Sequence, residues 1–237
     1  MESTYLNCLA LFGVGGAHPG GLQLTKNILS KEKIDDTMKI LDVGCGTGQT
    51  SAYLSKEYGC QVTALDCHKI MLEKAKERFR LMQLPIDTVY GNAENLPFED
   101  GSFDMVLSES VTAFTHISQS IPEFKRVLKP NGTLLAIEMT RENPVTEAEL
   151  AQIIRFYGVK QLLSEPEWCA HFQRAGFNHV HSEIFKLQTD AMNMYNAVDF
   201  SMSKDIDDSY FQILNEHQYL SMIYQDKIGC RIFRCRV

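Results

Sequence analysis

The chain has 237 residues, of which 44% are hydrophobic and 22% are charged, an ordinary composition for one α/β domain with elaborations. No apolar run approaches the roughly 20 residues that span a bilayer, and the N-terminus lacks the pattern of a signal peptide. A formal net charge of -7 argues against a nucleic acid substrate, because phosphate backbones attract basic surfaces.

The N-terminal part predicts a flap followed by a lone helix over residues 22–31. Residues 13–21 contain five glycines, and this content predicts a mobile segment that orders over a ligand. His18 lies within this flap. A histidine titrates near neutral pH, so His18 could act as a base or hold a substrate oxygen. It could equally fix the flap by a simple hydrogen bond.

A glycine loop follows the first predicted strand. The apolar residues Ile40, Leu41 and Val43 predict a buried parallel strand, and glycines follow at positions 44, 46 and 48. A helix is expected over 49–58, so its free N–H groups would face the loop. The spacing is G-x-G-x-G, whereas dinucleotide loops read G-x-G-x-x-G. A tight turn without a ligand is the alternative interpretation.

Strands and helices then alternate. The expected elements are a strand over 61–66, a helix over 69–82, strands over 86–90 and 103–108, a helix over 117–129 and a strand over 132–139. This alternation predicts a doubly wound parallel sheet that is covered on both faces. Asp66 ends its strand 18 residues after Gly48, where doubly wound folds place a ribose-binding carboxylate. A helix N-cap is the alternative role for Asp66.

The C-terminal part is less regular. We expect helices over 146–157 and 166–175, a strand over 178–187 and a last strand over 228–235. About forty residues, 187–226, separate these two strands, and a connection that long is more often functional than accidental. Apolar and aromatic residues recur at helical spacing from Tyr210 to Tyr224, so part of this insertion is predicted to be an amphipathic helix. We interpret it as a lid over a ligand-binding site, although its apolar residues could simply form its own core.

Four motifs occur in order between residues 39 and 139. They are the loop from Asp42 to Gly48, the strand ending at Asp66, the segment Gly91–Phe98 with Phe103–Val106, and Phe124–Leu135. Together they resemble class I S-adenosylmethionine-dependent methyltransferases of the type 11 branch, which includes ubiquinone and menaquinone methyltransferases. The resemblance implies one Rossmann-like domain over 1–237, with a seven-stranded, mostly parallel sheet. Its parts would be an N-terminal flap and helix (1–31), a cofactor-binding core (39–139) and a helical lid (187–226) inserted before the last strand.

The resemblance also implies S-adenosyl-L-methionine as the cofactor and no metal ion. The residues expected to bind it are Asp42, Gly44, Cys45, Gly46, Gly48, Asp66, Cys67, Met71, Asn92, Ala93, Glu94 and Ser108. A carboxylate at Asp42 would suit the ammonium group of the cofactor. Two positions depart from the family pattern, Asn92 where an aspartate is usual and Cys67 where a small or hydroxylic residue is usual. Cys45 is expected to be a small apolar filler, with a redox-sensitive thiol as the alternative.

Three residues are candidates for catalysis. In the resembling family, the loop after the fourth strand touches the cofactor and the acceptor, so Glu109 could meet a substrate amine or proton. Glu109 could also be a surface or capping carboxylate. His116 lies just before the next helix and could be a base or a packed histidine, and His18 is the third candidate.

The sequence therefore predicts methyl transfer to a small-molecule acceptor. An NAD-dependent oxidoreductase is the alternative, but the loop spacing and Asp42 argue against it. A non-catalytic S-adenosylmethionine-binding protein is a third hypothesis, although the loop glycines and both aspartates are intact. We expect a monomer or homodimer that binds no nucleic acid and has no membrane span. Seven cysteines without a C-x-x-C pair predict reduced thiols in the cytoplasm.

Overall fold

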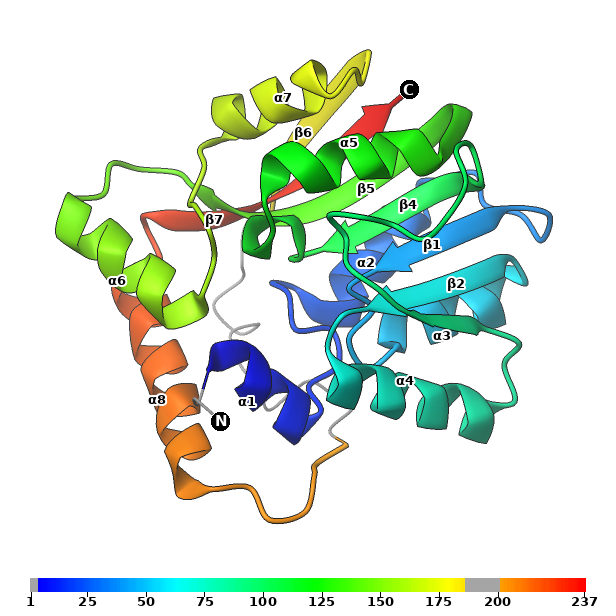
Figure 1. Ribbon diagram of the computed structural model, residues 1–237. Helices are drawn as coiled ribbons and strands as arrows, with labels where there is room; N and C mark the ends of the chain where they lie inside the picture. Colours follow the sequence, from blue (N-terminus) through cyan, green and yellow to red (C-terminus); the bar gives the residue numbers. More distant parts are fainter. Residues whose placement is uncertain (1–3, 186–200) are drawn as a thin grey trace.

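The computed structural model describes residues 4–185 and 201–237, and it contains one seven-stranded sheet in the order β3-β2-β1-β4-β5-β7-β6. The strands are β1 (Lys39–Val43), β2 (Gln61–Asp66), β3 (Asp87–Tyr90), β4 (Phe103–Glu109), β5 (Leu128–Arg141), β6 (His179–Phe185) and β7 (Ile228–Arg236). All neighbouring pairs from β3 to β5 are parallel, whereas β7 is antiparallel to both β5 and β6. The prediction of a mostly parallel, doubly wound α/β sheet is confirmed (Figure 1).

Helices cover both faces of this sheet. They are α2 (Gly21–Leu29), α3 (Gln49–Tyr58) and α4 (Lys69–Met82) on one face, and α5 (Ile117–Val127) and α7 (Glu165–Arg174) on the other. Buried apolar side chains of α2 and α3 pack with alternate residues of the strands, such as Ile40 and Leu107. The intervening residues, such as Leu41 and Val106, face α5 and α7. This alternation explains why the central strands are apolar on both faces.

The order in which strands are added to the sheet reverses between β1 and β4, although these two strands are parallel. From β1 the chain proceeds to β2 and β3 on one side, and it then returns to β4 and β5 on the other. In doubly wound sheets, ligands bind outside the carboxyl ends of the strands at this switch point. Asp42 and Glu109 lie near the carboxyl ends of β1 and β4, so both flank it.

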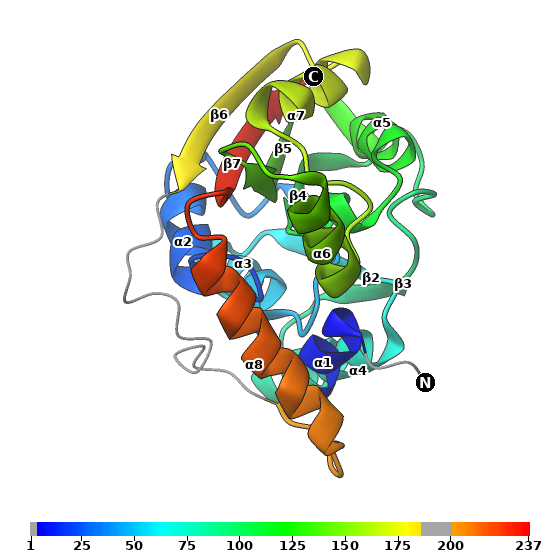
Figure 2. The ribbon, with the colours of Figure 1, turned by 90° about the vertical axis from the view of Figure 1, so that its left-hand side faces the viewer.

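Three helices pack together beyond the carboxyl edge of the sheet, as Figures 1 and 2 show. They are α1 (Tyr5–Phe12), α6 (Glu147–Tyr157) and α8 (Asp208–Ile223), and we call them the helical cap. The ring of Tyr5 lies 5.1 Å from that of Tyr157 and 5.3 Å from that of His217. The Phe12 and Phe211 rings are 5.0 Å apart. The cap therefore joins the N-terminus to the insertion before the last strand.

Most predicted elements are present, with two differences. The sequence predicts one helix before β1, but there are two, because α1 was not foreseen. The helix predicted over 117–129 ends at Val127, and Leu128 already pairs with Phe103. Pro130 disfavours helical backbone at the residue before it, which accounts for the early end of the helix. The helix predicted within 187–226 is α8, whereas residues 187–200 lie outside the described part.

Two helices of the C-terminal half begin with capping boxes. The Thr146 side chain accepts from the Glu149 backbone N–H, and the Glu149 carboxylate accepts from the Thr146 N–H. Ser164 and Glu167 form the same arrangement at α7. These reciprocal bonds satisfy N–H groups that a helix start leaves unpaired. They explain locally why α6 and α7 start where they do.

Candidate active site

The glycine loop between β1 and α3 forms an open cradle. Gly44, Gly46 and Gly48 have φ values of 67°, 55° and 77°, a region that other residues avoid. A Cβ atom on Gly44 would collide with Val111, and one on Gly48 would collide with Phe79. A Cβ atom on Gly46 would meet no atom within 4 Å. The first and third glycines therefore permit close packing, whereas the middle one borders open space.

Asp42 is buried one residue before the end of β1. Its carboxylate accepts a 2.5 Å hydrogen bond from the Ser51 hydroxyl in the first turn of α3. Burial raises the pKa of Asp42 to about 7, the charges of Glu109 and Asp66 act in the same direction, and the Ser51 bond opposes them. No lysine or arginine within the described ranges forms an ion pair with this carboxylate.

Asp66 ends β2 and holds the glycine loop. One carboxylate oxygen accepts from the Gly46 N–H at 2.8 Å, and the other accepts from the His68 N–H at 2.7 Å. Burial raises the pKa of Asp66, although these backbone bonds oppose the effect. The alternative role of N-cap is wrong, because the N-cap of α4 is His68 itself. Each oxygen of Asp66 keeps a lone pair for a further donor.

The turn after β3 carries three of the predicted cofactor residues. The Asn92 side chain accepts from the Glu94 N–H at 3.0 Å, and Ala93 is buried. The Glu94 carboxylate accepts from the His116 backbone N–H at 2.8 Å and lies 3.1 Å from its ring Nδ1. The side chain of His116 is 61% exposed. His116 therefore ties the start of α5 to this turn.

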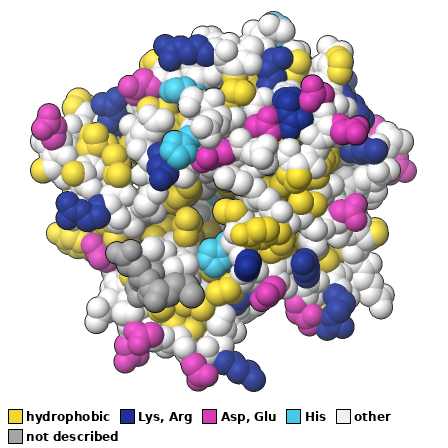
Figure 3. Space-filling model, viewed as in Figure 1, with side chains coloured by type: hydrophobic (Ala, Val, Ile, Leu, Met, Phe, Trp, Pro, Cys, Tyr) yellow, Lys and Arg dark blue, Asp and Glu magenta, His cyan; other side chains and the backbone are white. Residues whose placement is uncertain are grey.

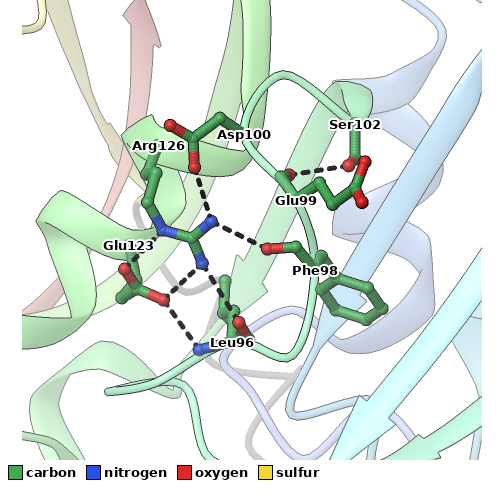
Figure 4. Close-up of polar contacts among 7 residues, drawn as sticks. All are labelled: Leu96, Phe98, Glu99, Asp100, Ser102, Glu123 and Arg126. Carbon is green, nitrogen blue, oxygen red and sulfur yellow. Dashed lines mark hydrogen bonds and ion pairs between the residues drawn. The ribbon is translucent and has the colours of Figure 1, made fainter.

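Arg126 clamps the segment that follows this turn, as Figure 4 shows. Its guanidinium donates to the carbonyl oxygens of Leu96 and Phe98 at 3.0 and 2.7 Å and to Asp100 at 2.9 Å. The Glu123 carboxylate accepts from Arg126 and from the Leu96 N–H. The planar guanidinium suits several fixed acceptors at once. Sequence analysis placed Arg126 in a motif but did not foresee this role.

Ser108 lies on the other face of the sheet, next to a buried acid. Its hydroxyl is 2.8 Å from the Thr112 hydroxyl and donates to Glu138 at 3.3 Å. The Glu138 carboxylate also accepts from the N–H groups of Thr112 and Ala113. Burial raises the pKa of Glu138 to about 7. Glu138 thereby fixes the loop after β4, a role that sequence analysis missed.

Glu109 and His18 meet, although 91 positions separate them in the sequence. Both Glu109 oxygens accept 2.6 Å hydrogen bonds, one from the Thr25 hydroxyl and one from the Thr50 hydroxyl. The His18 Nε2 atom lies 3.1 Å from the Thr25 hydroxyl and 3.7 Å from Glu109. The side chain of His18 is only 2% exposed and that of Glu109 only 11%. The flap, α2, α3 and β4 therefore share one polar cluster.

The remaining predicted residues differ in exposure. Cys45 is buried, and burial raises the pKa of its thiol well above the usual range, which is consistent with a packing role. Cys67 is exposed, and Met71 is buried in the first turn of α4. All seven cysteines are free thiols. Among the described residues, no helix is long and apolar enough to cross a membrane.

The face of the molecule in Figure 3 is hollowed near its centre, and hydrophobic side chains surround the hollow. A separate cavity of about 290 Å³ lies at the amino ends of β1, β2 and β3, at the opposite edge of the sheet. Ligands of doubly wound sheets bind at the carboxyl edge, so this cavity is not the expected site.

The residues present fit S-adenosylmethionine. The cofactor carries an ammonium and a sulfonium group. The two buried carboxylates of Asp42 and Asp66 form no ion pair with a lysine or arginine of the described part. Gly46 leaves open space for a ligand to approach the backbone. When bound, the cofactor supplies an electrophilic methyl group.

Comparisons with known proteins agree with a site for S-adenosylmethionine, because the matching proteins are methyltransferases. The family description "Methyltransferase domain" matches residues 41–136. A Bacillus subtilis (strain 168) protein named uncharacterized methyltransferase YodH is 42% identical over 231 residues, covering 98% of each chain. Demethylmenaquinone methyltransferase from Staphylococcus aureus (strain MRSA252) is 32% identical over 185 residues, covering 74% of this chain and 73% of that protein. The solved structure of phosphoethanolamine N-methyltransferase 2 from Haemonchus contortus, in complex with S-adenosyl-L-methionine, has a TM-score of 0.81 at 18% identity. That match covers 98% of this chain and 56% of the other.

The fold is that of a class I S-adenosylmethionine-dependent methyltransferase. The chain belongs to the methyltransferase type 11 family. It is an enzyme that transfers a methyl group from S-adenosyl-L-methionine. These matches confirm the prediction of S-adenosylmethionine-dependent methyl transfer over the oxidoreductase and the non-catalytic alternatives.

Proposed function

We propose that the acceptor is a small molecule, bound between the switch point and the helical cap. The observation that carries this proposal is the closure of the carboxyl edge by α1, α6 and α8. The Tyr5 ring packs on Phe156 and Tyr157 of α6 and on His217 of α8. Backbone bonds from the Ser201 N–H to Gly13 and from the Ser203 N–H to Leu11 add a further connection. A macromolecule would have to displace this cap.

Charge and relatives support the same class of acceptor. The net charge of -7 disfavours a nucleic acid. The names of two relatives state the acceptors demethylmenaquinone and phosphoethanolamine, both small molecules. The apolar rim of the hollow in Figure 3 suits an acceptor with an apolar part.

For the cofactor, we assign Asp42 to its ammonium group and Asp66 to its ribose hydroxyls. The twelve residues predicted from the resemblance remain our binding set, with Ser108 acting through the loop that Glu138 holds. Among the catalytic candidates, Glu109 is the best placed, because it flanks the switch point. The contact between His116 and Glu94 supports a role in holding the turn rather than a role as base.

The domain assignment is also part of this proposal. Residues 13–21 act as a flap, because Gly15 and Gly16 lie against the Gln49 side chain at the start of α3. The lid is the segment 187–226, of which the structure describes 201–226, and α8 in this described part belongs to the cap. We further propose a cytoplasmic enzyme, monomeric or homodimeric, consistent with seven free cysteines.

The test uses labelled cofactor. Methyl transfer from labelled S-adenosylmethionine is measured with a deproteinised cell extract and, separately, with bulk tRNA, rRNA and DNA. We expect label in small molecules only, and S-adenosylhomocysteine should bind in the micromolar range or tighter by calorimetry. Label in the nucleic acids with none in the extract would refute the proposal.

A further inference from the structure

The polar cluster around Glu109 lies at the centre of the proposed site. Glu109 is the last residue of β4, next to the switch point, and its side chain is 11% exposed. A cavity of about 10 Å³ beneath it is lined by Thr25 and by apolar residues of α2, β4 and β5. This space holds no more than about one water molecule. Glu109 therefore has apolar surroundings on one side and the site on the other.

The hydrogen bonds of the cluster require one proton more than an ionised Glu109, a neutral His18 and the two hydroxyls contain. Nδ1 of His18 lies 3.2 Å from the Pro19 carbonyl oxygen, which can only accept. Nε2 of His18 contacts the Thr25 hydroxyl, and Glu109 contacts the hydroxyls of Thr25 and Thr50. These four contacts need four protons. A neutral histidine ring and two hydroxyls supply only three.

The donors of the two contacts to Glu109 indicate where the additional proton lies. The hydroxyls of Thr25 and Thr50 each donate to one Glu109 oxygen at 2.6 Å. With both hydroxyls as donors, Glu109 is the ionised acceptor. His18 must then donate from Nε2 to the Thr25 oxygen and from Nδ1 to Pro19. The ring of His18 consequently carries both protons and one positive charge.

We propose that His18 and Thr25 are positioning residues that keep Glu109 ionised and oriented as the proton acceptor for the methylated substrate. This inference rests on the proposed function. His18 provides the counter-charge from the flap, and Thr25 transmits it through a hydroxyl. Glu109 retains one lone pair on each oxygen for a donor on the acceptor molecule.

The acceptor class follows from the balance of atoms. S-adenosylmethionine supplies a methyl group without its bonding electrons, so an acceptor X–H that becomes X–CH3 must release its proton. The electron pair of the X–H bond stays with X, and the proton passes to the Glu109 carboxylate. The acceptor is thus an amine, hydroxyl, thiol or acidic carbon whose reacting atom bears a proton.

The groups that face Glu109 are consistent with this role. β1 presents the acid Asp42, the flap presents His18, and α2 and α3 present the hydroxyls of Thr25 and Thr50. No lysine or arginine of the described segments pairs with Glu109. His18 is therefore the sole described cation beside two acids.

The test compares Thr25→Val with Thr25→Ser in the complex with S-adenosylhomocysteine. Long-range ¹H–¹⁵N spectra of ¹⁵N-histidine protein, assigned with His18→Gln, report both ring nitrogens of His18. We expect both nitrogens to be protonated at pH 7 in the wild type, and the second proton of the ring to be lost in Thr25→Val, where Nε2 has no hydroxyl to donate to. Thr25→Ser should restore it. Thr140→Val is the matched control, because it removes a 2.6 Å bond from a buried hydroxyl to Glu142, away from the site.

Rates complete the test. Thr25→Val should slow transfer of labelled methyl to the small-molecule extract about tenfold, and Glu109→Gln about a hundredfold, with S-adenosylhomocysteine affinity changed less than about threefold. A neutral His18 ring at pH 7, or a Thr25→Val protein that behaves like Thr140→Val in both spectrum and rate, would overturn the proposal. If the wild type transfers no methyl to the extract, the proposed function itself fails, whereas the spectra still decide the protonation of His18.

Discussion

The buried acid Asp42 makes a prediction about pH that follows from its position. Its pKa is about 7 in the folded chain, against 3.8 for an exposed aspartate. Because the folded state holds this proton to a higher pH, the contribution of Asp42 to stability is complete below about pH 3.8 and is lost as the pH rises to about 7. The difference between the two pKa values corresponds to at most about 4 kcal/mol. Glu138 has the same sign, with a pKa that rises from 4.5 to about 7.

Asp42→Asn removes the ionisation and keeps an oxygen for the Ser51 hydroxyl. At pH 8 the ligand-free variant should therefore melt at a higher temperature than the wild type, by about 2–4 °C for each kcal/mol recovered. At pH 4 the two proteins should melt close together. The same variant should bind S-adenosylhomocysteine more weakly, by about 1.5–3 kcal/mol, because a charged partner for the ammonium is lost. Wild-type affinity should weaken about tenfold when the pH falls from 8 to 6, because the ionised fraction of Asp42 falls by that factor around a pKa of about 7.

The assays are thermal unfolding at pH 4, 6 and 8, with and without S-adenosylhomocysteine, and calorimetry at the same pH values. Asp87→Asn, an exposed change at the amino end of β3, is the control and should alter neither quantity. An Asp42→Asn protein that is less stable than the wild type at pH 8 would refute the reasoning about burial. Unchanged ligand affinity would refute the assignment of Asp42 to the ammonium group.

Three further predictions concern the cofactor site. Asp66→Asn should weaken S-adenosylhomocysteine binding by about 1.5–3 kcal/mol in calorimetry, since ribose hydroxyls lose a charged acceptor. If the variant binds with the affinity of the wild type, Asp66 only holds the glycine loop and does not bind the ribose. Arg126→Lys should lower the free energy of unfolding in urea by about 1–2 kcal/mol, because an ammonium cannot reproduce the guanidinium contacts to Leu96, Phe98 and Asp100; Arg174→Lys, on α7, is the control. Hydrogen exchange of residues 13–21 should slow when S-adenosylhomocysteine binds; a flap that exchanges equally fast in both states would contradict its role in closure.

The sequence alone determined the features that depend on neighbouring residues. Alternating apolar segments predicted the parallel sheet, and glycines at alternate positions after an apolar strand predicted the cradle around Gly46. Asp42 and Asp66 could be identified because each lies at or next to the carboxyl end of an apolar strand, and carboxyl ends of parallel strands meet at one edge. The approximate bounds of most helices followed from periodicity.

Only the tertiary structure decided which distant residues act together. Helix α1 is short and apolar, so its sequence has no clear amphipathic period, and it is stabilised by rings of α6 and α8 far along the chain. The contact of Thr25 with Glu109 joins residues 84 positions apart, and neither residue carries a local signal of the other. Hydrophobic and capping patterns act over a few residues and are therefore readable in the sequence. The charge state of a buried group such as His18 depends instead on partners that only folding brings within hydrogen-bond distance.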